Sequence, residues 1–154
     1  MGVLEGVRVL DFGRYIAGPY CAALLGDLGA EVIRIEKRDG SEDRFVTPIA
    51  ETGEGAMFFQ MNRGKRSMTL DPTHPEGREI VRKLVKTADV VVANLPPPTL
   101  KQMGLDYDSL AATKPDIILT TASAFGDGGP YSARVGFDGI GQVMAGGTYM
   151  TGTE

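Results

Sequence analysis

The sequence predicts an α/β fold in which a Rossmann-like parallel sheet is flanked by helices. Short, mostly apolar runs typical of strands alternate with helix-like segments, which is the order expected of repeated strand–helix–strand units with right-handed crossovers. Most of these runs are apolar almost throughout, as in strands that are covered on both faces of a parallel sheet. A chain of 154 residues, 42% of them apolar, suits one modest domain.

The first strand–helix–strand unit occupies the N-terminal quarter of the chain. Residues 7–12 form a short apolar run that predicts a buried strand. Residues 20–28 are rich in helix formers, with Pro19 before them and Gly29 placed to end the helix. Residues 31–36 alternate apolar and charged side chains and predict the second strand.

The remaining elements follow in the same alternation. Residues 40–55 are polar and predict a long surface loop, and residues 67–71 are strand-like. Pro75 opens an amphipathic helix. Further elements are predicted as a strand at 89–94 that three prolines close, a helix at 107–113, a strand at 117–122 and a helix at 137–144.

Composition and charge exclude several classes of function. Sixteen basic and 20 acidic residues give a net charge of -4, and no basic run forms, so we expect no nucleic-acid partner. One cysteine and one histidine cannot build a disulfide framework, a zinc site or a Cys–His pair, so no metal site is assigned. The sequence has no basic leader and no long apolar run, and we expect a cytoplasmic protein without a membrane partner.

Two glycine-containing segments resemble phosphate-binding loops but lack their spacing. Residues 13–18 follow the first strand and precede a helix, where parallel sheets bind ligands, yet G-x-G-x-x-G is absent. Residues 64–67 resemble the end of a P-loop, but a strand rather than a helix follows them. Neither a dinucleotide nor a triphosphate site is therefore assigned.

The basic residues near these segments have two interpretations. They form either a solvated surface, which is usual for charged side chains, or a cluster around an anionic ligand that carries phosphates. They are Lys37, Arg38, Arg44, Arg63, Lys65 and Arg66.

Other conspicuous residues have structural interpretations that outweigh functional ones. We interpret His74 as a helix-entry residue, Cys21 as a small core residue and Asp138 as a helix cap. The apolar group at 57–61 is interpreted as core or interface. No paired carboxylates and no Ser-His-Asp set can be assembled by spacing, so no catalytic residue is assigned.

An ordered series of short motifs nevertheless resembles one family, the class III CoA-transferases (CaiB/BaiF), along the whole chain. The matching segments are 4–12, 17–19, 25–36, 40–44, 62–67, 70–71, 88–91, 94, 103–105, 115–118, 124–126 and 129–131. The resemblance implies a longer polypeptide that forms an interlocked homodimer. Residues 1–154 are then expected to be the N-terminal part of a CoA-binding Rossmann-like domain, truncated before the last elements of that domain.

The resemblance also implies a set of CoA-binding positions. Lys37 matches a basic residue near the adenosine-phosphate part of CoA, which reverses its interpretation as a solvated side chain. Residues 95–98 and Gln102 depart from the family pattern, and Ile16 stands where oxalate-using members have glutamine. The full set is Arg14, Tyr15, Ile16, Ala17, Lys37, Leu70, Asn94 and Leu95.

The implied reaction moves CoA between an acyl-CoA thioester and a carboxylic acid, with CoA as a substrate rather than a permanently bound cofactor. A family aspartate attacks the thioester, and the resemblance places it beyond residue 154, so the chain alone is expected to be inactive. Racemases of the family have histidine where this chain has Phe137. The alternatives are an α-methylacyl-CoA racemase-like enzyme and a non-catalytic remnant that binds CoA or a partner chain.

Overall fold

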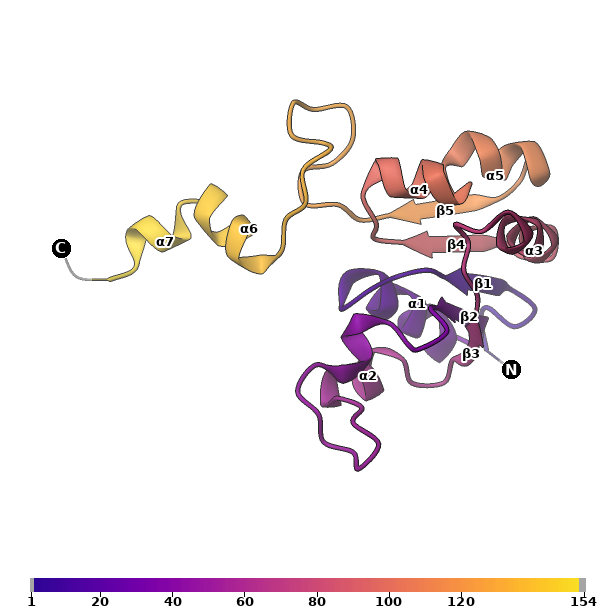
Figure 1. Cartoon of the computed structure of the whole chain (residues 1–154), viewed down its shortest axis with the longest axis horizontal. Coiled ribbons are helices and arrows are strands. Elements are labelled where there is room, and N and C mark those ends of the chain that lie inside the picture. Colours follow the sequence, from indigo (N-terminus) through magenta and orange to yellow (C-terminus); the bar gives the residue numbers. More distant parts are fainter. Residues whose placement is uncertain (1, 153–154) are drawn as a thin grey trace.

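The computed structural model describes residues 2–152 and contains one five-stranded parallel sheet (Figure 1). The strands lie in the order β3-β2-β1-β4-β5, so β1 is central and the connections reverse direction between β1 and β4. The strands are β1 (Arg8–Asp11), β2 (Glu31–Glu36), β3 (Arg66–Thr69), β4 (Val90–Ala93) and β5 (Ile118–Thr121). The predicted parallel α/β fold is thus confirmed.

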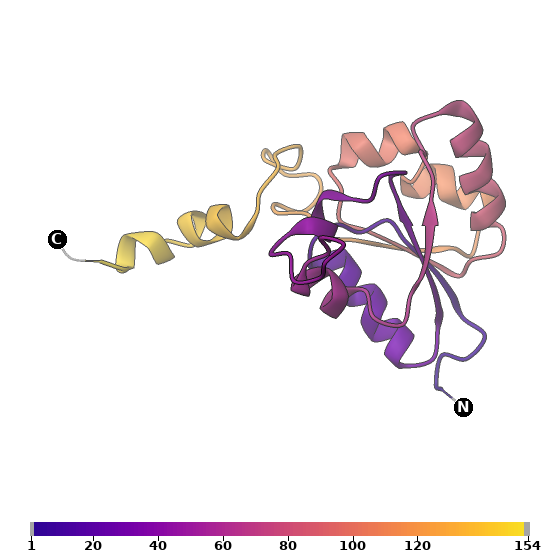
Figure 2. The ribbon, with the colours of Figure 1, turned by 60° about the horizontal axis from the view of Figure 1, so that its bottom comes forward.

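Helices cover both faces of this sheet. The helices are α1 (Ala17–Asp27), the short 3-10 helix η1 (Glu42–Phe45), α2 (Ala56–Met61), α3 (Pro75–Val85), α4 (Pro97–Met103), α5 (Tyr107–Thr113), α6 (Asp138–Met144) and α7 (Gly147–Met150). Helices α3, α4 and α5 lie over one face, whereas α1 lies on the other with α2 nearby (Figures 1 and 2). No helix within residues 2–152 is long and apolar enough to cross a membrane.

Alternate residues of the central strands supply the two halves of the core. Leu10 of β1 and Val91 of β4 belong to the larger cluster, which includes side chains of α3, α4 and α5. Their neighbours Val9 and Val92 belong to the smaller cluster beside α1. This alternation follows from the strand period of two and explains why the runs are apolar at nearly every position.

Two segments contain more helix than the sequence predicted. The polar loop expected at 40–55 includes η1, and α2 follows it at once. The prolines at 96–98 do more than end β4, because Pro97 is the first residue of α4. Proline is well tolerated there, since the first amides of a helix have no intrahelical acceptor.

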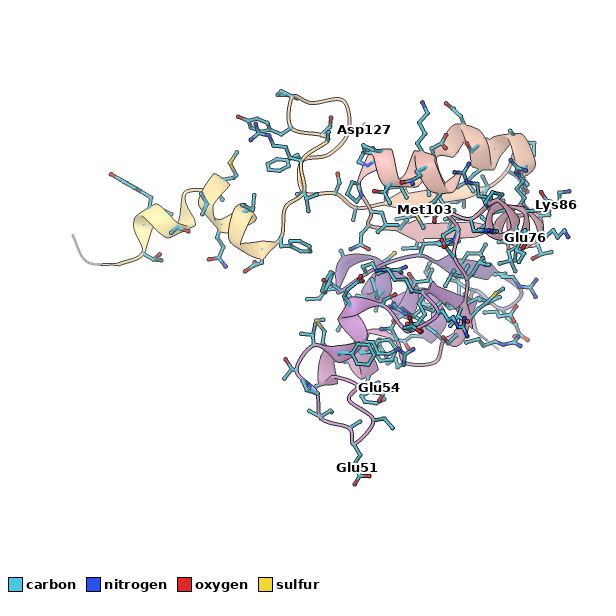
Figure 3. All side chains as sticks on the ribbon, viewed as in Figure 1. Glu51, Glu54, Glu76, Lys86, Met103 and Asp127 are labelled. Atoms are coloured by element: carbon cyan, nitrogen blue, oxygen red, sulfur yellow. The ribbon has the colours of Figure 1, made fainter. Side chains whose placement is uncertain are left out.

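Helices α6 and α7 form an arm that extends from the body of the molecule (Figures 1 and 2). Neither helix has a buried residue, and the arm's side chains project from an isolated pair of helices (Figure 3). The base of the arm contacts the body where the Phe137 ring packs edge-on against the Tyr15 ring, with centroids 5.5 Å apart.

Candidate functional site

A large cavity lies beside the point where the sheet topology reverses. Its volume is about 960 Å³, and its walls come from the β1–α1 loop, the β4–α4 loop, the segment after β5 and one side of α6. Loops that diverge from two adjacent strands leave a crevice at such a point, which is where open α/β sheets bind ligands. The lining is mainly apolar, with the charged side chains Arg14, Arg134 and Asp138 among the described residues.

Asn94 joins two of the loops that line this cavity. Its Oδ1 accepts a hydrogen bond from the Arg14 amide at 2.6 Å, and its Nδ2 donates to the Arg14 carbonyl at 2.8 Å. Gly18 lies so close that a Cβ there would stand 2.8 Å from Asn94 Oδ1. The glycine at position 18 therefore permits the approach of α1 to the Asn94 side chain.

The Arg14 side chain caps the carboxyl ends of β1 and β2. Its Nη1 lies 3.1 Å from the Phe12 carbonyl, 2.8 Å from the Gly13 carbonyl and 3.2 Å from the Ile35 carbonyl. Burial lowers the pKa of Arg14, as does the nearby charge of Arg34, but an arginine keeps its proton at neutral pH. The site therefore holds a fixed positive charge beside the cavity.

Tyr15 adopts a left-handed backbone conformation, with φ of 59°. Such a conformation is disfavoured for a residue with a Cβ, so surrounding contacts have to hold it. The Tyr15 amide donates to Asp43 Oδ2 at 3.1 Å, and the Tyr15 ring packs on Phe137. Tyr15 is thus tied to η1 through Asp43 and to the start of α6 through Phe137.

A buried ionic cluster lies behind this loop. Arg34 Nη2 donates to both carboxylate oxygens of Asp43 at 2.9 Å, and each of these two side chains is only 1% exposed. Arg34 Nη1 donates to Asn62 Oδ1 at 2.9 Å. The guanidinium of Arg44 pairs with Glu36 and lies 4.1 Å from the centroid of the Phe58 ring. Buried charges of this kind are stable only when they are paired, as they are here.

Lys65 belongs to the same cluster and not to a phosphate-binding loop. Its Nζ lies 2.7 Å from Asp11 Oδ2, 2.7 Å from the Pro19 carbonyl and 2.9 Å from Asn62 Oδ1. Burial lowers the pKa of Lys65, although the attraction of Asp11 opposes that shift. Because its ammonium group is fully engaged inside the protein, Lys65 is a structural residue.

The basic residues near the two loops therefore do not converge on one ligand site. Arg44 and Lys65 are engaged in the buried cluster, whereas Arg63 pairs with Asp27 and Arg66 with Glu31 at the surface. The interpretation of this set as a single phosphate-binding cluster finds no geometric support.

Six of the eight CoA positions implied by the resemblance line the large cavity: Arg14, Tyr15, Ile16, Ala17, Asn94 and Leu95. Lys37 and Leu70 do not. Lys37 follows β2, has a side chain that is 62% exposed, and forms an ion pair with Glu42. Leu70 follows β3 and packs, partly buried, against the larger core cluster. Both nevertheless stand at the carboxyl edge of the sheet, as the cavity does.

Sequence reasoning missed the Arg34–Asp43 pair. In β2 the charged residues at 34 and 36 alternate with apolar ones, a pattern that normally indicates a solvent-facing side of a strand. Both residues are instead buried. One signal in the sequence could have indicated the pair. Residues 31–36 were predicted to form a strand of a parallel sheet, where charged side chains become buried and then need partners of opposite charge.

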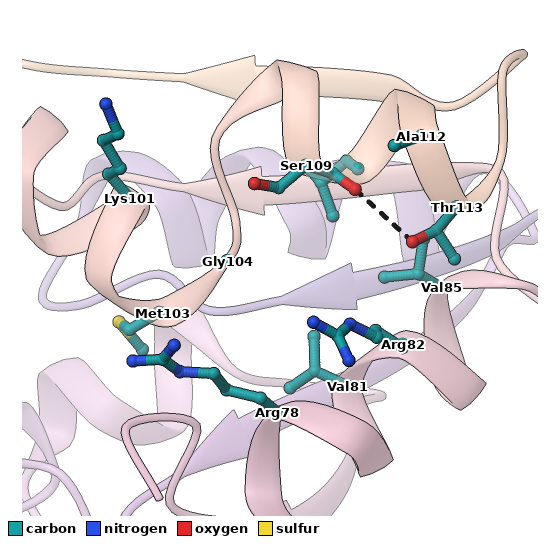
Figure 4. Close-up of a pocket in the computed structure, with 11 residues that line it drawn as sticks. Arg78, Val81, Arg82, Val85, Lys101, Met103, Gly104, Ser109, Ala112 and Thr113 are labelled. Carbon is teal, nitrogen blue, oxygen red and sulfur yellow. Dashed lines mark hydrogen bonds between the residues drawn. The ribbon is translucent and has the colours of Figure 1, made fainter. Parts of the chain in front are cut away.

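A smaller cavity of about 300 Å³ lies between α3 and the α4–α5 pair (Figure 4). Arg78 and Arg82 of α3 and Lys101 of α4 line it, and Arg82 pairs with Glu79 at 3.2 Å. None of the residues that the sequence nominated as a ligand contact lies in this cavity. Within residues 2–152, no group of three or more histidine, cysteine or carboxylate side chains is placed to hold a metal ion.

Comparisons with known proteins match both the sequence and the fold. The chain is 40% identical over 156 residues to a succinate–glutarate CoA-transferase of Agrobacterium fabrum, covering 97% of this chain and 39% of that protein. It is 40% identical over 155 residues to the succinyl-CoA:glutarate CoA-transferase of Mus musculus, covering 100% of this chain and 36% of that protein. The crystal structure of a CaiB/BaiF family protein from Brucella suis superposes with a TM-score of 0.89 and 42% identity, over 98% of this chain and 41% of that one.

The chain thus spans about two fifths of the length of the relatives that it matches. The sequence model described as CoA-transferase family III matches residues 4–154, which is nearly the whole chain. This protein belongs to the class III CoA-transferase (CaiB/BaiF) family.

Proposed function

We propose that this chain is the CoA-binding part of an enzyme that moves CoA between an acyl-CoA thioester and a carboxylic acid. The observation that carries the proposal is the cavity at the reversal of the sheet, because six of the eight nominated CoA positions meet there. A site of this size and apolar character suits a large, elongated ligand with few charged groups along its arm.

The arrangement of donors around the β1–α1 loop supports binding of an anionic ligand. The amides of Arg14 and Tyr15 are already engaged by Asn94 and Asp43. The amides of Ala17 and Gly18, in the first turn of α1, have no intrahelical acceptor, and Pro19 has no N–H. Together with the charge of Arg14, they are suited to the diphosphate of CoA.

The proposed chemistry is covalent catalysis by an aspartate beyond residue 154. Its carboxylate attacks the thioester carbonyl, the carbon–sulfur bond breaks, and CoA leaves as a thiolate while an acyl–aspartyl anhydride forms. The thiolate then attacks the aspartyl carbonyl, which releases the first acid and leaves an aspartyl-CoA thioester. The carboxylate of the incoming acid then attacks the aspartyl-CoA carbonyl and displaces the CoA thiolate, which forms a second anhydride. The thiolate attacks the acyl carbonyl of this anhydride, giving the new acyl-CoA and the free aspartate. The proposed enzyme is an interlocked homodimer.

The alternative racemase function is disfavoured by the residue at the base of α6. Phe137 lines the cavity and packs on Tyr15, where a proton-transfer mechanism would need an ionisable side chain. Asp138 also lines the cavity, but the resemblance matches it to an acidic position other than the nucleophile. It accepts a hydrogen bond from Gln142 Nε2 at 2.7 Å.

Calorimetric titration of the chain with CoA tests the binding step. Wild-type protein should bind saturably, and Arg14→Met should weaken binding by about tenfold, the worth of one charge-assisted contact. Arg78→Met, in the smaller cavity, is the matched control and should leave the affinity unchanged. Absence of saturable binding, or an equal loss in the control, would refute the assignment of this cavity to CoA.

Transfer itself is tested by joining the chain to the polypeptide that follows Glu154. The extended protein should exchange CoA between succinyl-CoA and a carboxylic acid such as glutarate, the pair named for two of its relatives. The isolated chain should give no exchange above a buffer control. Exchange by the isolated chain would refute the placement of the nucleophile. Deuterium incorporation at the α-carbon of a 2-methylacyl-CoA would instead support the racemase.

A further inference from the structure

We propose that Asp43, held in place by Arg34, is a positioning residue that fixes the loop of residues 13–17 in the shape that binds CoA. The inference rests on the proposed function in one respect only, the identity of the ligand. Its structural part, that Asp43 holds the loop, stands on contacts between named atoms.

Asp43 connects the buried cluster to the loop through one carboxylate. Its two oxygens both accept from Arg34 Nη2, and Oδ2 also accepts from the Tyr15 amide. Since the Asp43 and Arg34 side chains are each 1% exposed, water does not compete for these bonds. The position of the carboxylate is therefore set by Arg34, which Asn62 holds in turn.

The loop needs such an anchor because its backbone is in a disfavoured conformation. Tyr15 has a φ of 59°, and neither of its neighbours is a glycine that would ease the turn. Asn94 fixes Arg14 but makes no bond to Tyr15. Of the described side chains, Asp43 is the one that hydrogen-bonds the Tyr15 amide, so it opposes relaxation of this residue to negative φ.

Relaxation of Tyr15 would change the cavity in two places. The Tyr15 ring would leave its contact with Phe137, whose ring centroid lies 5.5 Å from that of Tyr15. The amides of Ile16 and Ala17, which follow directly, would turn with the chain. Without Asp43 the folded protein would therefore sample several loop shapes, and CoA would bind only the fraction in the competent one.

The test compares Asp43→Ala with Val85→Ala, a substitution in the core on α3 that lies away from the loop. Both variants should lose stability, so the control reports what destabilisation alone does. Two quantities are measured for each under conditions where circular dichroism confirms a folded protein. They are the hydrogen-exchange rates of the amides of residues 13–17 and the dissociation constant for CoA. Asp43→Asn, which keeps the side-chain volume, replaces the alanine variant if that variant does not fold.

We expect Asp43→Ala to speed exchange of the Tyr15 amide and its neighbours and to raise the dissociation constant by about tenfold. Val85→Ala should change neither loop exchange nor affinity. Wild-type exchange rates in the Asp43 variant, or equal changes in the control, would overturn the proposal. Faster loop exchange with unchanged affinity would likewise overturn it. If wild-type protein binds no CoA, the proposed function fails, while the exchange rates still decide whether Asp43 holds the loop.

Discussion

Asn94 hydrogen-bonds both backbone polar groups of Arg14, a residue 80 positions earlier in the chain. One amide side chain thereby fixes the separation of the loops that follow β1 and β4. Because these two strands flank the reversal of the sheet, the width of the crevice depends on this contact.

Substitution of Asn94 should therefore affect both folding and ligand binding. Asn94→Ala leaves an amide and a carbonyl without partners and should lower the free energy of unfolding by about 1–3 kcal/mol. Asn94→Asp keeps an acceptor for the Arg14 amide but places a carboxylate against the Arg14 carbonyl, so it should not restore stability. Urea denaturation measures both variants, and wild-type stability in Asn94→Asp would contradict the two-bond arrangement.

Gly18 should not tolerate a side chain. A Cβ at this position would lie 2.8 Å from Asn94 Oδ1 and 2.9 Å from the Gly13 Cα. Gly18→Ala should destabilise the protein by about 1–3 kcal/mol through this overlap. The matched control is Gly139→Ala in α6, where no atom lies within 4 Å of the added Cβ. Thermal unfolding should separate the two variants, and equal melting temperatures would show that the Asn94 side chain moves aside at little cost.

Glu36 should contribute to the acid sensitivity of the fold. Burial alone would raise the pKa of its carboxyl, but hydrogen bonds from Arg44, Ser67 and the Ser41 amide outweigh burial and lower it. A carboxyl with a lowered folded-state pKa stabilises the protein fully above its unfolded pKa of about 4.3. That contribution is lost as the pH falls through the folded-state value.

Glu36→Gln should accordingly be less stable than wild type at pH 7, and the difference should shrink as the pH is lowered below about 4. The measurement is the free energy of unfolding in urea at several pH values. If the difference in unfolding free energy between the two proteins stayed constant across this pH range, the lowered pKa of Glu36 would be contradicted.

Lys37 should distinguish CoA from its dephosphorylated form. The resemblance places it near the adenosine-phosphate end, and in this structure its exposed ammonium group pairs with Glu42. Lys37→Ala should weaken CoA binding about two- to fivefold, the range of an exposed ion pair. Binding of 3′-dephospho-CoA should not change.

The variant Glu42→Gln removes the carboxylate that pairs with Lys37 and should strengthen CoA binding slightly. An equal loss for both ligands in Lys37→Ala would place Lys37 away from that phosphate.

The sequence was sufficient for the fold class, because the alternation of strands and helices follows from local patterns. Apolar runs predict β1 and β4, and an alternation of apolar and charged residues predicts β2. The β1–α1 loop was nominated by the family resemblance. The helix α4 was missed because three adjacent prolines indicate a break, whereas the second of them is the first residue of the helix.

The buried ionic cluster could not be predicted in the same way. Arg34 and Asp43 are both charged residues that a local pattern assigns to the surface, and only the packing of η1 against the end of β2 brings them together. Lys65 stood in a sequence resembling a P-loop, but its ammonium group lies against Asp11, 54 residues away. Contacts between such distant positions are set by tertiary structure, which periodicity does not encode.

The separation of Arg14 from Asn94 also has a consequence during synthesis of the protein. At about 5–20 residues per second, the 80 residues from position 15 to Asn94 take roughly 4–16 s to be translated. During that interval the amide and carbonyl of Arg14 lack the side chain that pairs with them in the folded protein. Nascent chains that end before β4 should therefore expose an unformed β1–α1 loop to proteases and chaperones, even where β1 and β2 have already paired.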